Sequence, residues 1–279
     1  MKKSILIPTD FSENAWSALN YALKFYAGEE CTFYLLNSYY FSNAHSRTFI
    51  TSHFIATLKE ASQRDLVALK NKIEKQNTNT AHSFEIIMSS DELSYAIKHS
   101  IEKYSIDTVV MGTKGASGID KFFFGSNTVK TIQNIKSCPV LAVPDNMAFV
   151  APRQIAFATD FNRPYVKAVL DKLLALINLH DAHLNVVHIN VEKTLSDVQQ
   201  KNVNELKEFL KDNKHSFHWM PAYSTKSEII NDFIKEMNID MLAMFNYRHS
   251  IIENMTKEPI IKKIGYHPII PFLIIPANN

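Results

Sequence analysis

The sequence has few cysteines, no marked excess of charge and no long apolar run. Two cysteines in 279 residues exclude a disulfide-stapled scaffold and fit a reducing compartment. A net charge of +2 lacks the basic surplus typical of a nucleic-acid groove. No apolar run approaches the roughly 20 residues of a membrane-spanning helix. Pro8, Asp10 and Glu13 interrupt the stretch that could resemble a signal peptide. We therefore expect a cytoplasmic protein with no nucleic-acid or membrane partner.

The sequence does contain a repeat at about half its length. Ile5–Ser12 returns as Ile155–Asn162, an offset of 160 − 10 = 150. His82–Phe84 returns as His215–Phe217, an offset of 215 − 82 = 133. The order is kept while the offset falls by 150 − 133 = 17, so the first half carries an insertion. The period is far too long for a solenoid repeat, and it indicates a duplicated domain.

Short apolar runs alternate with helical patterns in each half, which is typical of βαβ units and a parallel sheet. The expected fold class is α/β, with two tandem, doubly wound, five-stranded domains at residues 1–147 and 148–279. The predicted strands cover residues 4–9, 32–38, 84–88, 108–112 and 140–143, then 154–159, 184–190, 217–220, 241–245 and 272–275.

The glycines are clustered. Four of the six, Gly112, Gly115, Gly118 and Gly125, lie between a predicted strand and the next helix. Glycine permits close approach of backbone N–H groups and a positive φ, and a helix N-terminus attracts phosphate. Asp10 ends the first strand at the same edge of the sheet. The P-loop motif is absent, and no glycine follows the first strand as the Rossmann motif requires. The alternative is that these glycines only shape a loop.

The spacing Gly112-x2-Gly115-x9-Gly125-Ser126, with Ile7–Glu13 and Ser137–Val143, resembles the universal stress protein family. The resemblance implies a 3-2-1-4-5 sheet of the nucleotide-binding α-hydrolase type and, for members with this motif, bound ATP with Mg²⁺ on its phosphates. It also implies the contacts. Adenine and ribose would be contacted by Pro8, Thr9, Asp10, Asn37 and Ser38. Ribose and the α/β-phosphates would be contacted by Met111, Gly112, Lys114 and Gly115. The β/γ-phosphates would be contacted by Gly125, Ser126, Asn127 and Thr128.

The second half keeps Asp160 but departs from the glycine pattern. Residues 246–259 contain no glycine, and Lys257-Glu258-Pro259 stands where Gly125-Ser126-Asn127 stands in the first half. We interpret this half as a degenerate domain that has lost nucleotide binding. Its histidines do not predict a metal site, because His183 and His188, like His215 and His218, are separated by odd numbers of residues and fall on opposite faces of a strand.

The sequence indicates nucleotide binding but does not indicate a chemical reaction. No nucleophile–base pair or second-substrate site is evident, so an enzyme is the less favoured hypothesis. The favoured one is an ATP-binding regulatory protein of the stress response, whose nucleotide state sets contacts with an unidentified protein. The alternatives are an enzyme that hydrolyses ATP or transfers its phosphoryl or adenylyl group, and a scaffold with an empty site. We further predict an intramolecular pseudo-dimer through Val140–Val143 and Phe272–Ile275, with a further homodimer left open.

Overall fold

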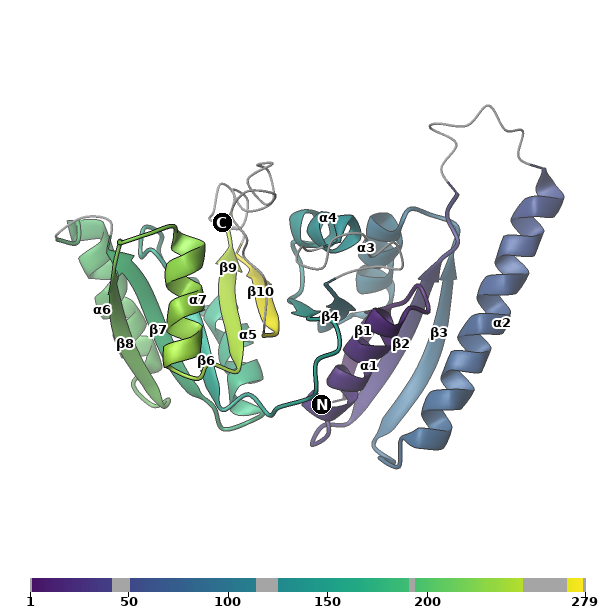
Figure 1. The fold of residues 1–279 in the computed structure, drawn as a ribbon, viewed down its shortest axis with the longest axis horizontal. Helices are drawn as coiled ribbons and strands as arrows, with labels where there is room; N and C mark the ends of the chain where they lie inside the picture. The colour runs from purple at the N-terminus through teal and green to yellow at the C-terminus, as the bar shows by residue number, and fades with distance from the viewer. Residues whose placement is uncertain (1, 42–50, 114–124, 191–193, 248–269, 278–279) are drawn as a thin grey trace. The chain divides into compact units, whose positions relative to one another are not determined.

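The computed structural model describes residues 2–41, 51–113, 125–190, 194–247 and 270–277 (Figure 1). The chain divides into two compact units, the first ending at Met147 and the second beginning at Ala148. Each unit is an α/β domain whose strands are all parallel. The predicted fold class is confirmed.

The first unit contains a parallel sheet in the strand order β3-β2-β1-β4-β5. Its elements alternate along the chain: β1 (Lys3–Pro8), α1 (Glu13–Phe25), β2 (Cys31–Ser38), α2 (Ser52–Gln76), β3 (His82–Ser89), α3 (Leu93–Tyr104), β4 (Thr108–Gly112), α4 (Ser126–Asn134) and β5 (Val140–Val143). The order is the one that the family resemblance implied.

The direction of winding reverses between β1 and β4. The chain first builds outward from β1 to β2 and β3, then returns to place β4 on the other side of β1. Right-handed crossovers consequently put α1 and α2 on one face of the sheet and α3 and α4 on the other. α1 packs on β4, and α3 packs beside α4. Ligands of open α/β sheets bind at such a reversal, beyond the carboxyl ends of the strands.

The second unit has the corresponding order β8-β7-β6-β9-β10. Its elements are β6 (Gln154–Ala158), α5 (Lys167–Asn178), β7 (His183–Asn190), α6 (Asp197–Leu210), β8 (His215–Pro221), α7 (Lys226–Glu236), β9 (Met241–Asn246) and β10 (Phe272–Pro276). In Figure 1 these elements run from teal to yellow.

Burial accounts for the strand pattern. Every residue of β4, β5, β9 and β10 is buried, as expected for parallel strands covered on both faces. The two cysteines, Cys31 and Cys138, are buried and form no disulfide. Among the described residues no helix is long and apolar enough to cross a membrane.

The turn after the first strand of each unit has the same unusual geometry. Phe11 has a φ of 63° and Phe161 a φ of 57°, in the left-handed region that non-glycine residues seldom occupy. The backbone N–H of Phe11 donates to Thr9 Oγ1 at 3.0 Å, and that of Phe161 donates to Thr159 Oγ1 at 3.4 Å. Ser12 caps α1 by accepting from the N–H of Ala15 at 3.2 Å.

Candidate functional site

A pocket of about 290 Å³ lies at the winding reversal of the first unit. It is lined by residues at the carboxyl ends of β1, β2 and β4 and just beyond β1 and β2, by one residue of α1, and by residues at the beginnings of α3 and α4. These are Pro8, Thr9, Asp10, Ala15, Asn37, Ser38, Tyr40, Glu92, Leu93, Met111, Gly112, Gly125, Ser126, Asn127 and Thr128. Every predicted nucleotide contact that the structure describes is among them. Lys114 and Gly115 lie outside the described residues.

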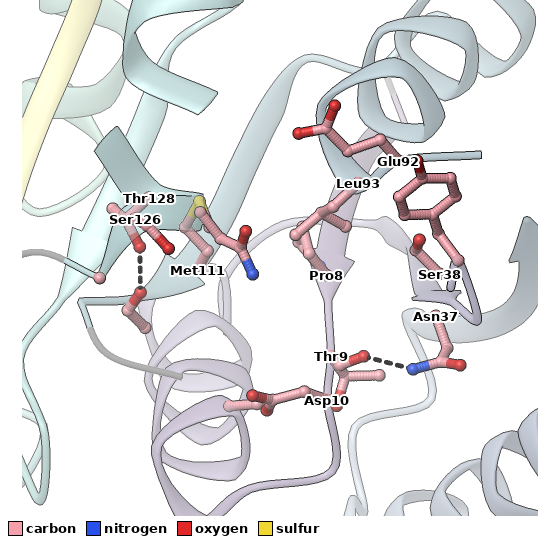
Figure 2. A pocket seen from close by; sticks show the side chains of 15 residues that line it. Pro8, Thr9, Asp10, Asn37, Ser38, Glu92, Leu93, Met111, Ser126 and Thr128 are labelled. Atoms are coloured by element: carbon pink, nitrogen blue, oxygen red, sulfur yellow. Dashed lines mark hydrogen bonds between the residues drawn. The ribbon is translucent and has the colours of Figure 1, made fainter. Parts of the chain in front are cut away.

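The pocket has two sides. Met111, Ser126 and Thr128 gather on one side of Pro8 and Thr9, as Figure 2 shows. Ser38 and Glu92 lie toward the other side, with Leu93 next to Pro8 (Figure 2). We call the first the α4 side and the second the α3 side. The polar groups therefore form two clusters joined by the end of β1, an arrangement suited to an elongated ligand.

The α4 side offers backbone donors. Gly125 is the N-cap of α4 and makes no side-chain cap hydrogen bond. Ser126 and Asn127, the first two residues of the helix, are exposed at the pocket. The first N–H groups of a helix have no partner within the helix and carry a partial positive charge. This side can therefore accept an anionic group such as phosphate.

Thr128 anchors this helix. Its hydroxyl donates to the Gly112 carbonyl at 2.9 Å, and its side chain is almost fully buried. The hydrogen bond ties the first turn of α4 to the end of β4. The Thr128 hydroxyl thus donates its hydrogen within the protein rather than to a ligand, and the residue holds the backbone N–H groups at the start of α4 in position.

Gly112 is required by packing. A Cβ at this position would lie 2.6 Å from Cγ and 2.7 Å from Oδ1 of Asn14, a buried residue of α1. No glycine in the described part of the chain has a positive φ. Gly125 has φ −58° and ψ 151°, which any residue adopts. Close approach of Asn14, rather than unusual backbone geometry, explains Gly112.

Asn37 links three elements beneath the pocket. Its amide Nδ2 donates to the Thr9 carbonyl at 2.8 Å, which Figure 2 marks. Its Oδ1 accepts from the Ser62 hydroxyl of α2 at 2.7 Å. Asn37 and Ser62 are both buried. The Asn37 side chain therefore fixes the end of β1 relative to β2 and α2.

Asp10 is exposed at the rim of the pocket. Its Oδ1 accepts from the backbone N–H of Ser12 at 3.1 Å and from the Ser12 hydroxyl at 2.6 Å. The carboxylate is therefore oriented by the turn that leads into α1. It places an anionic hydrogen-bond acceptor between the two sides of the pocket.

Four lining residues were not predicted: Ala15, Tyr40, Glu92 and Leu93. Glu92 forms an ion pair with Lys130 of α4, with 2.8 Å between Oε1 and Nζ. Its position just before α3 brings it to the pocket, and no sequence motif marks it. Tyr40 lies two residues beyond the end of β2. Its aromatic character was the only available signal, and aromatic residues are common throughout the chain.

The second unit replaces the pocket's small and polar residues. In the strand registers, His188 occupies the place of Asn37, and its Nδ1 lies 2.9 Å from the Thr159 carbonyl. Its ring lies 4.9 Å from that of Phe161. Burial lowers the pKa of His188 below its usual value. The linkage between the first two strands is therefore retained with a different side chain.

Two aromatic residues of the second unit correspond to two small pocket residues of the first unit. The strand registers place Phe245 at the position of Gly112. Tyr165 corresponds to Ala15 by the 150-residue sequence offset alone, because it precedes α5 whereas Ala15 lies within α1. Their ring centroids are 6.1 Å apart, and the Tyr165 hydroxyl bonds to Thr159 Oγ1 at 2.7 Å. We call this pair the aromatic plug. Residues 248–269, which include Lys257-Glu258-Pro259, lie outside the described residues.

The histidines of the second unit meet in a way that the sequence analysis missed. His183 of β7 and His218 of β8 both contact Ser216 Oγ, at 2.9 and 2.8 Å. Spacing within one strand could not reveal a pair formed across two strands. Burial and the neighbouring His183 lower the pKa of His218. In the described parts of the chain, no three His, Cys, Asp or Glu residues form a metal-binding group.

Comparison with known proteins identifies the family. The sequence model of the universal stress protein family matches residues 1–144. The chain belongs to this family. None of the curated proteins matches it.

Solved structures extend the likeness to the whole chain. A universal stress protein from Archaeoglobus fulgidus has a TM-score of 0.73 and 18% identity, with 97% of this chain and 95% of that one covered. A protein of unknown function from Pseudomonas aeruginosa has a TM-score of 0.59 and 11% identity, with 98% and 92% covered. The cytoplasmic domain of a prokaryotic cation chloride cotransporter has a TM-score of 0.53 and 8% identity, with 99% and 96% covered. At these identities the likeness concerns the fold alone.

Proposed function

We propose that this universal stress protein is a cytoplasmic ATP-binding regulatory protein of the stress response with one nucleotide site, in its first unit. The nucleotide state would set its contacts with a protein partner. The observation that carries the proposal is the two-sided pocket, with backbone donors at α4 and the Asp10 carboxylate between its sides. The second unit has the aromatic plug in place of Ala15 and Gly112.

The residues that line the pocket fit a nucleoside triphosphate. The N-terminus of α4, with Gly125, Ser126 and Asn127, would hold phosphates that also bind Mg²⁺. Asp10 would accept hydrogen bonds from ribose hydroxyls. The end of β2, at Asn37 and Ser38, would lie by the base. Met111 and Gly112 would form the floor between them, and Thr128 and Asn37 would hold these elements in position.

The aromatic plug argues for one site per chain. A nucleotide in the second unit would have to displace rings that are packed together, and Phe245 is almost completely buried. Burial also raises the pKa of Tyr165, so its hydroxyl stays protonated and hydrogen-bonded to Thr159. Calorimetric titration with MgATP should therefore give a stoichiometry of one.

The two aspartates supply a matched pair of variants. Asp10 and Asp160 each accept a backbone hydrogen bond two residues ahead, at 3.1 Å in both units. Hydrogen bonds to a carboxylate contribute about 1.5–3 kcal/mol. Asp10→Ala should therefore weaken ATP binding about tenfold or more. Asp160→Ala removes the same turn bond in the other unit and should leave ATP affinity unchanged. Equal effects of the two variants would refute the assignment.

Turnover distinguishes the regulatory hypothesis from the enzymatic one. A regulatory protein should release ADP or AMP no faster than its Gly125→Lys, Ser126→Glu variant, which blocks the α4 side. Release that disappears in this variant would favour the enzyme. Native mass spectrometry of the purified protein would show which nucleotide it carries.

A further inference from the structure

The α3 side of the pocket includes an aromatic residue that the proposed function leaves unassigned. Tyr40 lines the pocket together with Ser38, Glu92 and Leu93. It is the only aromatic residue among the described residues that line it. About half of its surface, 51%, is exposed. Large aromatic side chains at a pocket rim offer a stacking surface for a flat ligand group.

The chain leading to Tyr40 is fixed. The backbone N–H of Tyr39 donates to the Ser89 carbonyl at 2.9 Å. The Ser38 hydroxyl donates to the Asp91 carbonyl at 2.6 Å. The first bond ties the residue after β2 to the last residue of β3, and the second ties the last residue of β2 to the segment between β3 and α3. Tyr40 therefore lines the pocket next to an anchored backbone, so stacking on its ring would require little further ordering of the chain.

Charge orients an anionic nucleotide in the pocket. On the α3 side the Glu92 carboxylate and the Lys130 ammonium group form an ion pair at 2.8 Å, so the pair offers phosphate no net positive charge. The α4 side has the helix N-terminus, which favours phosphate. A nucleotide with its phosphates at α4 consequently places its base on the α3 side, where Tyr40 lies.

We propose that Tyr40 stacks on the base of the bound nucleotide and selects purines over pyrimidines. A purine covers more of the phenol ring than a pyrimidine does. Counted along the sequence from the positions of Asn37 and His188, Tyr40 corresponds to Val191, so the sequence of the second half has no aromatic residue there; Val191 lies outside the described residues. The inference rests on the proposed nucleotide site.

The test compares ligands with and without a base. The full chain and its Tyr40→Ala and Tyr40→Phe variants are titrated calorimetrically with MgATP, MgCTP and magnesium tripolyphosphate. Tyr95→Ala is the matched control, because Tyr95 is 67% exposed on α3 and does not line the pocket. Loss of base stacking should weaken ATP binding about tenfold or more and leave tripolyphosphate binding unchanged.

The remaining variants sharpen the outcome. Tyr40→Phe keeps the ring and should bind ATP like the unmodified protein, as should Tyr95→Ala. The preference for ATP over CTP should shrink in Tyr40→Ala. If the unmodified protein binds ATP and Tyr40→Ala binds it within about twofold, the stacking role is wrong. If Tyr40→Ala weakens tripolyphosphate equally, Tyr40 only shapes the pocket. If the unmodified protein binds no nucleotide, the proposed function itself fails.

Discussion

Substituting Gly112 by alanine should destabilise the first unit through one contact. The new Cβ would lie 2.6 Å from Cγ of Asn14, whereas non-bonded carbon atoms are normally about 3.5–4.0 Å apart. Asn14 is 6% exposed in the first turn of α1. Relief therefore requires a rotation of a packed side chain or a shift of the helix against β4.

Overpacking of this kind costs typically about 1–3 kcal/mol. For a domain of this size, each kcal/mol lowers Tm by roughly 2–4 °C. The same strain should weaken ATP binding, because the Gly112 carbonyl accepts the Thr128 hydroxyl that anchors α4. Urea and thermal unfolding, followed by circular dichroism, measure the stability change. Calorimetry measures the change in ATP affinity.

Two controls isolate the contact. Gly28→Ala should not overpack the fold, since nothing lies within 4 Å of a Cβ built at Gly28. In Asn14→Ala the opposing side chain is removed, so adding Gly112→Ala to it should cost much less than in the unmodified protein. Additivity of the two substitutions within about 0.5 kcal/mol would refute the reasoning, as would full stability of Gly112→Ala.

Three further predictions concern pH, the polar core and the chain connection. Burial lowers the pKa of His188, so the unfolded chain takes up the proton first and the second unit should lose stability as the pH falls below about 6.5; equal urea midpoints at pH 7.5 and 5.5 would contradict this. Ser62→Ala leaves Asn37 Oδ1 without its buried donor and should cost about 1–3 kcal/mol in urea unfolding, whereas a change near zero would show that Asn37 is not held as described. If β5 and β10 form a pseudo-dimer, halves separated near Asn146 should aggregate alone or reassociate when mixed, and two soluble, non-interacting monomers would refute it.

The pocket residues at the ends of the first and fourth strands could be predicted from the sequence, because residues suited to binding a nucleotide directly follow or end a recognisable strand. Pro8, Thr9 and Asp10 follow an apolar run, and Gly112 ends another. Parallel strands bring such ends to one edge of the sheet. Tyr40, Glu92 and Leu93 could not be found in this way. They reach the pocket through the path of the chain after β2 and before α3, which depends on hydrogen bonds between loops.

Two strand boundaries were predicted two residues too late. β3 begins at His82 instead of Phe84, and β8 at His215 instead of Phe217. Within its own unit each of these strands has one neighbour, β2 or β7. Such a strand tolerates polar residues that a central strand excludes, and apolar patterning alone therefore misses its beginning. The aromatic plug was missed for another reason, since only the strand registers equate Phe245 with Gly112.

The two phenylalanines with a left-handed backbone conformation, Phe11 and Phe161, should differ in how well they tolerate substitution. Phe11 is 39% exposed, so glycine or asparagine could relieve its backbone strain with little loss of buried surface. Phe161 is 1% exposed and packs against His188 and Trp219, so its ring belongs to the core. Substitutions should therefore be tolerated more readily at Phe11 than at Phe161. The packing role of Phe161 gives this part of the repeat a reason to stay recognisable that does not depend on whether the second half binds a nucleotide.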